Sequence, residues 1–486
     1  MNLSLISLEI CVMTLGLVVL LADLWLPAER KKCLGYLAAV ALGVLLVINL
    51  TGSGSCTMPG KAFNDMFVQD ALSIFFKRFF LLAAIIVLVM IAEFSDRIAA
   101  GISEYYSLVL FSLVGMLFAS SANNFALLFV SLELITVSFY VLTSFQRARL
   151  GSLEAGVKYL IIGALSTAFT VFGIALVSGT SGKFNFTELS VAAAGMGDNK
   201  LFLFGLLFVM VGLGFKIAAF PFQIWAPDVY QGAPTPTTAF LAVGSKAAGF
   251  VLLLRVLFIA VPSVTAHWAN VIIIISGITI LYGNLCAIPQ QNVKRLLGYS
   301  SIAHAGYLLL GVAAMAGAKT SAGAAAMLYY LSGYLFTVLA AFIVITVVMR
   351  HLESEDISGL AGLARRSPLL ATTMTFSMVS LAGLPPLAGF FGKFLLLKSV
   401  IDLGPTNHGY YCLAFTAVAG VVISIYYYFK VVRAIFWSQP SDALPIAISV
   451  PIRCAIYVCI AGMFWLGLFP NCLLELATNG AKALGF

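Results

Sequence analysis

Long apolar stretches alternate with short polar ones along the whole chain of 486 residues. A helix needs about 20 apolar residues to cross the hydrocarbon core of a bilayer. Stretches of this length recur throughout and leave no room for a water-soluble domain. The pattern therefore predicts an all-α polytopic membrane protein with about 14 transmembrane helices. The predicted spans cover residues 5–26, 34–50, 75–91, 105–122, 125–145, 155–177, 201–220, 237–260, 269–288, 293–314, 324–349, 369–401 (interrupted), 410–436 and 452–469.

The composition excludes a soluble protein. Hydrophobic residues make up 62% of the chain and charged residues only 9%, too few to cover a water-exposed surface. The net charge of +8 would point to nucleic acid in a soluble protein. Here the basic residues gather in alternate loops, which is the usual signal of membrane topology. We expect a lipid bilayer and no nucleic acid as the surroundings of this chain.

The loops also predict an orientation. No Lys or Arg precedes the first span, which contains Glu9, so we expect no cleaved signal peptide and a non-cytoplasmic N-terminus. Loops after odd-numbered spans then carry 14 basic residues, against 8 in the remaining loops and the C-terminus. Because cytoplasmic loops are enriched in Lys and Arg, both termini are predicted on the non-cytoplasmic side. Lys77 and Arg78 fall on the wrong side in this arrangement.

The cysteines indicate neither a metal site nor a disulfide framework. All 8 are scattered, mostly in apolar stretches, without a CxxC motif or a Cys/His cluster. No GxGxxG motif lies on a strand-to-helix turn. We therefore expect no metal and no cofactor in this chain.

Six ionisable residues fall inside apolar spans. A Lys or Asp at the centre of a membrane helix costs roughly 2.5–3.5 kcal/mol on insertion scales, so a functional role is the default hypothesis for each. A static ion pair or a side chain that reaches the interface remains the alternative for any one of them. The candidate site residues are Glu133, Lys158, Lys216, Lys246, His304 and Lys393.

The residue types favour proton relay. At about 1.5 Å per residue, Glu133, Lys216, Lys246 and His304 lie near the middle of a ~30 Å core, where they would form a polar layer. The proton affinity of a lysine in an apolar site depends on whether a carboxylate lies nearby. A sodium site would use mainly carboxylates and carbonyls, whereas this set has four lysines and one carboxylate.

Two of the spans contain prolines that should break the helix. "GLGFKIAAFPF" joins Lys216 to Pro221, and "LAGLPPLAGFFGKF" joins Pro385 and Pro386 to Lys393. Broken membrane helices are typical of transport sites, although a simple proline kink is the alternative.

The two breaks lie five spans apart, which predicts a repeat. Because five is odd, such a repeat would enter the membrane from opposite faces, with helices 4–8 and 9–13 as the inverted pair and Glu133 matched by His304. The predicted units are residues 1–100 (helices 1–3), 101–261 (first repeat), 262–440 (second repeat) and 441–486 (helix 14).

Three motifs carry a resemblance to a known family. "GFKIAAFPFQIWAPDVYQGAPTPTTAFLAVGSKAAG", "NVKRLLGYSSIAHAGYLLLG" and "LAGLPPLAGFFGKF" resemble the antiporter-like, proton-pumping membrane subunits of respiratory complex I, which are related to Mrp-type cation/proton antiporter subunits. The resemblance covers roughly residues 100–440. Within the family, "PDVYQGAPTP" followed by "SK" is similar to the N-type subunit of bacterial NADH:quinone oxidoreductase and unlike the L and M types.

The resemblance implies a fold and a set of roles. It implies fourteen helices, inverted five-helix repeats, and broken helices 7 and 12. Glu133 and Lys216 match the glutamate–lysine pair of helices 5 and 7, and Lys158 matches the modulating lysine of helix 6. Lys246 matches the central lysine of helix 8, and Lys393 the lysine of helix 12. Gln223 departs from the family, where many members have His, and is left out of the site.

The resemblance also implies surroundings. NADH, FMN, iron–sulfur clusters and quinone would belong to other subunits of an enzyme complex in the bacterial inner membrane, and this chain would hold no complete active site. The expected partners are the antiporter-like M subunit and small membrane subunits such as K and J. Protons would cross through the Glu/Lys/His relay, driven by quinone reduction elsewhere. The alternatives are a subunit of a Mrp-type antiporter or membrane-bound hydrogenase, and a scaffold whose charges are static ion pairs.

Overall fold

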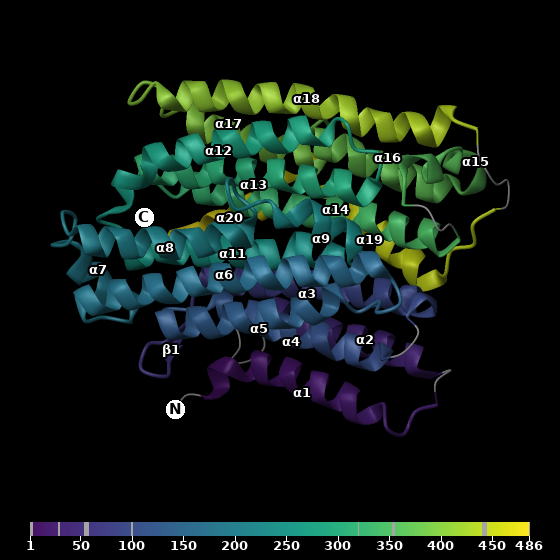
Figure 1. Cartoon of the computed structure of the whole chain (residues 1–486), viewed down its shortest axis with the longest axis horizontal. Coiled ribbons are helices and arrows are strands. Elements are labelled where there is room, and N and C mark those ends of the chain that lie inside the picture. The colour runs from purple at the N-terminus through teal and green to yellow at the C-terminus, as the bar shows by residue number, and fades with distance from the viewer. Residues whose placement is uncertain are drawn as a thin grey trace.

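The computed structural model describes residues 3–27, 30–52, 58–98, 101–318, 320–351, 355–439 and 445–485. It is a bundle of long helices that run side by side along the long axis (Figure 1). Thirteen helices of the described part are long and apolar enough to cross a membrane. The prediction of an all-α polytopic membrane protein is thus confirmed.

Most spans consist of one continuous helix. One of the thirteen spans, Thr235–Ala260, is instead a composite. It consists of α10 (Thr235–Phe240) and α11 (Lys246–Leu254), with π-helical stretches at Leu241–Ser245 and Arg255–Ala260. The continuous helices are α1 (Ser7–Ala22), α2 (Lys31–Thr51), α3 (Ala71–Phe94), α4 (Ile102–Ser120), α5 (Phe125–Thr143), α6 (Leu150–Ser181), α8 (Lys200–Ile217), α12 (Thr265–Ala287), α13 (Val293–Ala318), α14 (Ala322–His351), α18 (Gly409–Trp437) and α19 (Val450–Leu468).

Shorter elements complete the bundle. A two-stranded antiparallel hairpin and the helices α7 and α20 were not anticipated from the sequence, because each is too short to give a membrane-length apolar signal. The short elements are β1 (Gly60–Ala62), β2 (Phe67–Gln69), α7 (Phe186–Ala193), α9 (Trp225–Gly232), α15 (Leu363–Arg366), α16 (Pro368–Ala382), α17 (Ala388–Ile401), α20 (Pro470–Lys482) and 3-10 turns at Leu3–Ile6, Ser95–Arg97 and Ile357–Leu360.

Both predicted helix breaks are present. The seventh span is divided into α8 and α9, and the twelfth into α16 and α17. The divided twelfth span is not among the thirteen long helices and brings the number of predicted spans that are present to fourteen. Each first half ends at a residue of left-handed backbone, Ala218 (φ 57°) or Gly383 (φ 85°). In each case a proline with a cis peptide follows three residues later, at Pro221 and Pro386. The two breaks therefore have the same local backbone.

Close helix contacts fix the register of the inverted repeat. A Cβ added to Gly115 in α4 would lie within 3.0 Å of Ser131 O and Ile135 N in α5. A Cβ added to Gly283 in α12 would likewise lie within 2.8 Å of Tyr299 O and Ala303 N in α13. Each residue of the second contact lies 168 positions after its counterpart in the first, so α4–α5 and α12–α13 are packed alike.

The register corrects one sequence-based pairing. Helix 5 does correspond to helix 10, but a shift of 168 residues matches Glu133 with Ser301 and Thr136 with His304. The expected pairing of Glu133 with His304 is therefore wrong by three residues, close to one helical turn. The sequence motifs did not reveal this, because the register depends on where small residues let two helices approach.

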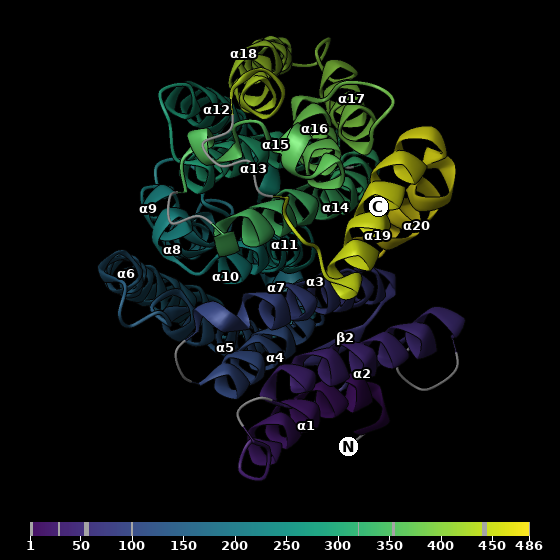
Figure 2. The same cartoon turned by 90° about the vertical axis from the view of Figure 1, so that its right-hand side faces the viewer.

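The interior of the bundle is formed mainly by the second half of the chain. Viewed along the helices, α11, α13 and α14 lie centrally, with α1 and α2 at one edge and α18 at the other (Figure 2). The spans that contain α11, α13 and α14 are 94%, 89% and 94% buried, whereas those of α1 and α2 are 33% buried. The central helices therefore place their polar side chains away from lipid.

The charge of Lys77 has a structural explanation. Lys77 lies within α3, its Nζ is 2.7 Å from Glu9 Oε1, and both side chains are fully buried. It is therefore not a loop charge and does not count against the predicted orientation. Figure 1 places both termini at the same end of the helices, as an even number of crossings requires.

Candidate functional site

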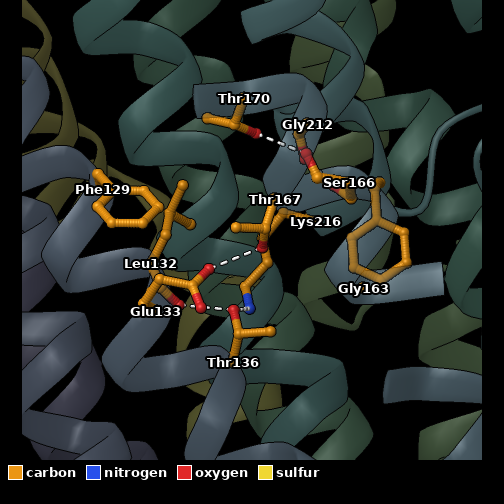
Figure 3. Close-up of a pocket in the computed structure, with 11 residues that line it drawn as sticks. Phe129, Leu132, Glu133, Thr136, Gly163, Ser166, Thr167, Thr170, Gly212 and Lys216 are labelled. Atoms are coloured by element: carbon orange, nitrogen blue, oxygen red, sulfur yellow. Dashed lines mark hydrogen bonds between the residues drawn. The ribbon is translucent and has the colours of Figure 1, made fainter. Parts of the chain in front are cut away.

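Glu133 and Lys216 line one small cavity. Glu133 lies on α5 and Lys216 on the last turn of α8, just before the break at Ala218. The cavity has a volume of about 20 Å³ and its wall also includes Thr136, Thr167 and Thr170 (Figure 3). This volume is enough for one water molecule. Lys216 is 5% exposed and Glu133 is half-buried.

Each of the two charges is bonded to a threonine hydroxyl. Lys216 Nζ donates to Thr136 Oγ1 over 2.8 Å, and Thr167 Oγ1 donates to Glu133 Oε1 over 2.7 Å (Figure 3). The ammonium and the carboxylate are not within ion-pair distance of each other. Thr136 in turn donates to Leu132 O over 2.5 Å, so the two threonine hydroxyls are not bonded to each other and a water molecule in the cavity would have to join them.

Lys158 lies away from this cavity. Its side chain is 41% exposed, and its Nζ is 2.7 Å from both Glu154 and Asp228. Asp228, on α9, also binds Arg295 over 2.6 Å. Lys158 thus belongs to a network of ion pairs at the perimeter of the bundle, and the structure does not bring it together with Lys216.

Lys246 contacts the second repeat. It is 3% exposed and follows directly after the π-helical stretch Leu241–Ser245. Its Nζ donates to both the carbonyl and the hydroxyl of Ser301 on α13. The Ser301 hydroxyl is also 2.9 Å from Tyr230 Oη and 3.1 Å from Tyr334 Oη. Lys246 is therefore connected to a group of hydroxyls that both donate and accept.

His304 occupies the centre of this group. It is 2% exposed, its Nδ1 pairs with Tyr330 Oη, and its Nε2 is 3.0 Å from Tyr428 Oη. Tyr428 Oη is in turn 2.5 Å from the Ser300 hydroxyl. The ring of Tyr334, which bonds Ser301, lies 5.1 Å from the His304 ring, centroid to centroid. The cluster brings Lys246 and His304 together through α13 and α14.

Lys393 lies at the second break. It is 4% exposed and donates to Leu381 O and Ala382 O, over 2.7 and 3.2 Å, at the end of α16. Its Nζ also lies 4.8 Å from the centre of the Tyr307 ring. The C-terminal end of a helix carries partial negative charge, which favours a cation there. Lys216 and Lys393 thus both place a positive charge at the end of the first half-helix of a broken span.

The sequence reasoning missed the tyrosines. Tyr230, Tyr307, Tyr330, Tyr334 and Tyr428 surround Ser301 and His304, and all are buried. A signal existed in "YYLSGY" and "IYYYF", where phenol groups recur inside apolar spans. A buried Tyr hydroxyl needs a partner, so such runs indicate a polar interior.

Other buried charges are held in fixed pairs, as the scaffold alternative would require. Arg255, fully buried, donates to both carboxylate oxygens of Asp70 over 2.9 and 3.0 Å and to Ser120 O. Lys77 and Glu9 form a second such pair. By contrast, Lys216, Lys246 and Lys393 have no carboxylate within ion-pair distance among the described residues. A purely structural role therefore fits Arg255 and Lys77, but it does not fit the three lysines without a described carboxylate partner.

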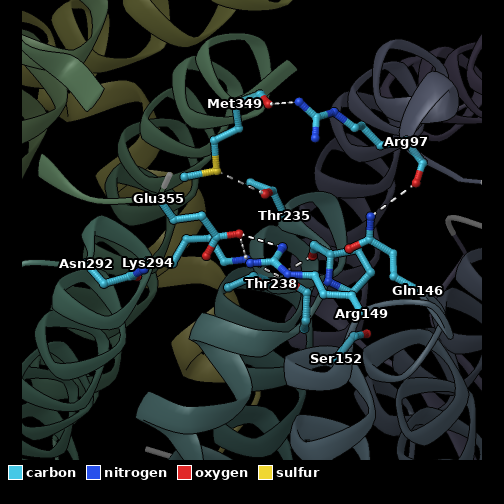
Figure 4. A network of polar contacts seen from close by, with 12 residues as sticks. Arg97, Gln146, Arg149, Ser152, Thr235, Thr238, Asn292, Lys294, Met349 and Glu355 are labelled. Carbon is cyan, nitrogen blue, oxygen red and sulfur yellow. Dashed lines mark hydrogen bonds and ion pairs between the residues drawn. The ribbon is translucent and has the colours of Figure 1, made fainter. Parts of the chain in front are cut away.

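A third network joins the two repeats at one end of the bundle. Glu355 Oε1 lies 2.7 Å from Arg149 of the first repeat and 3.1 Å from the fully buried Lys294 of the second (Figure 4). Lys294 also donates to Ala233 O. Burial would raise the pKa of the Glu355 carboxyl, but Lys294 and Arg149 outweigh it and hold that pKa below its usual value. The network therefore stays charged at neutral pH.

No group of three or more His, Cys, Asp or Glu side chains in the described part of the chain could hold a metal ion. The site residues described above carry ammonium, imidazole, carboxylate and hydroxyl groups. These groups exchange protons.

Comparison with known proteins places the chain in a family. The model of the NADH:quinone oxidoreductase/Mrp antiporter transmembrane family matches residues 122–424. NADH-quinone oxidoreductase subunit N of Desulforamulus reducens is 37% identical over 482 residues, which cover 99% of this chain and 98% of that protein.

Solved structures agree on the fold. A chain of respiratory complex I from Thermus thermophilus with bound aureothin is 31% identical, with a TM-score of 0.80 over 97% of this chain and 100% of that one. A chain of the Mrp complex from a Dietzia species has a TM-score of 0.84 over 98% of both chains, but at 20% identity it shows the fold alone. The chain therefore belongs to the antiporter-like membrane subunits of NADH:quinone oxidoreductase, and within them to the subunit N family.

Proposed function

We propose that this membrane subunit moves protons across the bilayer along the buried polar layer that begins at Glu133 and Lys216 and continues through Lys246 and His304 to Lys393. The observation that carries the proposal is the burial of three lysines and one histidine, each 2–5% exposed and each bonded to a hydroxyl or a carbonyl. Such groups are costly in a membrane interior and mark proton pathways.

Ammonium, imidazole and hydroxyl groups line this layer. Thr136 bonds Lys216 and Thr167 bonds Glu133, and the cavity beside them has room for one water molecule that would join the two. Ser301 bonds Lys246 and Tyr334, the Tyr334 ring lies 5.1 Å from the His304 ring, and Tyr330 and Tyr428 bond the two His304 nitrogens. The Tyr307 ring lies 6.0 Å from the imidazole and 4.8 Å from the Lys393 ammonium, and its hydroxyl donates to Ala417 O, so a side-chain movement or a water molecule would complete this step.

The step from Lys216 to Lys246, both in the first repeat, is the one that must move. No hydrogen bond joins Lys216 to Lys246 among the described residues. The stem of Lys216 packs against Gly249, one turn after Lys246 in α11, where an added Cβ would lie 3.2 Å from Lys216 Cγ. The break at Ala218 frees the end of α8, so the lysine can approach Glu133 in one state and Lys246 in another.

Membership in the family supports a proposal for the surroundings of the subunit. NADH, FMN, iron–sulfur clusters and quinone are bound by other subunits of the complex, and quinone reduction there drives the relay. The neighbours are other membrane subunits, namely an antiporter-like M subunit and small subunits such as K and J. The subunit lies in the bacterial inner membrane with both termini on the non-cytoplasmic side, because the basic loops cluster at the opposite end.

Replacing Lys246 with Met tests the function, because Met retains most of the stem and removes the titratable group. Proton pumping and NADH oxidation are measured in proteoliposomes that contain the assembled complex. We expect the variant to assemble and to pump at least about tenfold more slowly, since relay groups contribute about that much or more. Lys183→Met, an exposed lysine paired with Glu188, is the matched control.

The outcome also decides between related functions. Undiminished pumping by Lys246→Met would contradict the relay. Purification of the chain with antiporter subunits, and without any NADH-oxidising partner, would contradict its place in the respiratory enzyme.

A further inference from the structure

A polar cavity lies apart from the relay, at the end of the bundle that carries the basic loops. It has a volume of about 620 Å³ and lies among the loop after α3, the first turns of α4 and the loop between α5 and α6. Its wall includes three arginines, Arg97, Arg147 and Arg149, and one carboxylate, Glu104. The charge on the wall is therefore positive on balance.

The arginines that line the cavity retain N–H donors beyond the bonds that they make. Arg97 donates through Nη2 to Met349 O and Arg350 O, and Arg149 donates through Nη1 to Glu355. Figure 4 shows these two arginines on either side of Gln146. Each guanidinium carries further N–H groups beyond these bonds. All three arginines are exposed, and no described side chain pairs with Arg147.

The opposite wall is apolar and continues along the outside of the bundle. Leu108, Val141 and Phe145 line the cavity. Val141 is 44% exposed, and Val137 and Val130 follow on the same face of α5 with 53% and 57% exposed. The cavity thus opens onto an apolar stripe that runs toward the middle of the membrane.

We propose that this cavity binds the headgroup of an anionic phospholipid, with the phosphate among Arg97, Arg147 and Arg149 and the acyl chains along the Val141–Val137–Val130 stripe. Arginine binds phosphate through paired N–H groups, and basic cavities between membrane helices suit anionic headgroups. A soluble phosphate would use the arginines but not the stripe. A lipid uses both.

The lipid would also act on the junction between the repeats. Arg149 is shared between the cavity and Glu355, which holds the buried Lys294. A phosphate beside Arg149 would lie within the same charge network that joins the first repeat to the second (Figure 4). Loss of the lipid should therefore loosen this end of the bundle without removing any group of the proton relay.

The test uses the assembled complex in nanodiscs and phosphatidylglycerol with a quencher on its headgroup. A fluorophore is attached to a cysteine introduced by Ala148→Cys, because Ala148 lines the cavity, in a chain whose exposed native cysteines have been replaced. We expect quenching by labelled phosphatidylglycerol and much weaker quenching by labelled phosphatidylcholine. Arg147→Gln should weaken the phosphatidylglycerol response about fivefold, as expected for one basic residue at an anionic surface.

Arg433→Gln is the matched control, because Arg433 is an exposed arginine on α18 outside this cavity. Equal responses to the two lipids, or equal loss in the Arg147 and Arg433 variants, would overturn the proposal. Full competition by inorganic phosphate would also overturn it, in favour of a free-anion site. Absence of quenching by either labelled lipid would overturn it as well, because no lipid then reaches the cavity in the assembled complex.

Discussion

The two repeats place different chemistry at equivalent positions. In the first repeat, Glu133 and Thr136 face Lys216 across a small cavity, with one threonine hydroxyl bonded to each charge. In the second, the same positions are Ser301 and His304, and five buried tyrosines surround them. The backbone has been kept, down to the left-handed residue and the proline at each break. The side chains have changed from an acid–base pair to a row of neutral hydroxyls and one imidazole.

This difference indicates a division of labour. A carboxylate near a lysine makes the proton affinity of each depend on their separation, which suits a switch. The second site has no carboxylate among its described contacts, and its hydroxyls can each donate and accept a proton. We infer that the first repeat controls when a proton moves and the second conducts it.

The largest effect is expected in the conducting site. Tyr330→Phe removes the hydroxyl that pairs with His304 Nδ1 and changes nothing else in the ring. Pumping per assembled complex should fall about tenfold or more, because a relay group is lost. The neighbouring Tyr329→Phe is the control, since Tyr329 bonds Leu466 O outside the cluster. Equal rates in the two variants would remove Tyr330 from the path.

A smaller effect is expected from the bridging hydroxyl of the first site. Thr136→Val keeps the shape and the charges but removes the acceptor of Lys216 Nζ. Pumping should fall about threefold to tenfold, in line with the net loss of one ordinary hydrogen bond. Thr170→Val changes a threonine of the same cavity wall that bonds Ser166 O, and should pump normally. If both valine variants pump alike, the hydroxyl at Thr136 is only a packing group.

The smallest effect is expected at Lys158. The family resemblance gives this lysine a modulating role, yet its side chain is 41% exposed and already bound to two carboxylates. Exposed ion pairs contribute about 0–1 kcal/mol, so Lys158→Gln should assemble and pump within about twofold of the unchanged complex. The pumping rate of this variant, measured across pH and compared with that of the unchanged complex, checks this expectation. A tenfold loss would bring Lys158 into the relay despite its position.

The sequence predicted the parts of the structure that apolar length and proline determine. Helix number, both breaks and the pairing of helices 5 and 10 were foreseen, because span length and Pro221 or Pro386 act locally. The register within that pairing was not. It depends on close approach at Gly115 and Gly283, which no single-chain pattern shows.

The candidate site was foreseen only in its charged members. Lys216, Lys246, Lys393 and His304 are buried as expected, since an isolated charge in an apolar stretch is conspicuous. The tyrosines were missed, because a phenol ring fits an apolar helix and only its partners reveal its use. The buried ion pairs of Lys77 and Arg255 were not foreseen either, because their partners Glu9 and Asp70 are distant in the chain.

The central claim is that Glu133 and Lys216 form a switch and not a structural pair. The most direct measurement is the proton-pumping rate per assembled complex, in proteoliposomes, of the double variant Glu133→Gln/Lys216→Met. If the two charges only stabilise each other, losing one should cost about 3–5 kcal/mol and losing both much less, with function restored. The switch predicts that the double variant assembles normally and pumps poorly, because no titratable group remains in the cavity. Full pumping by the assembled double variant would contradict it.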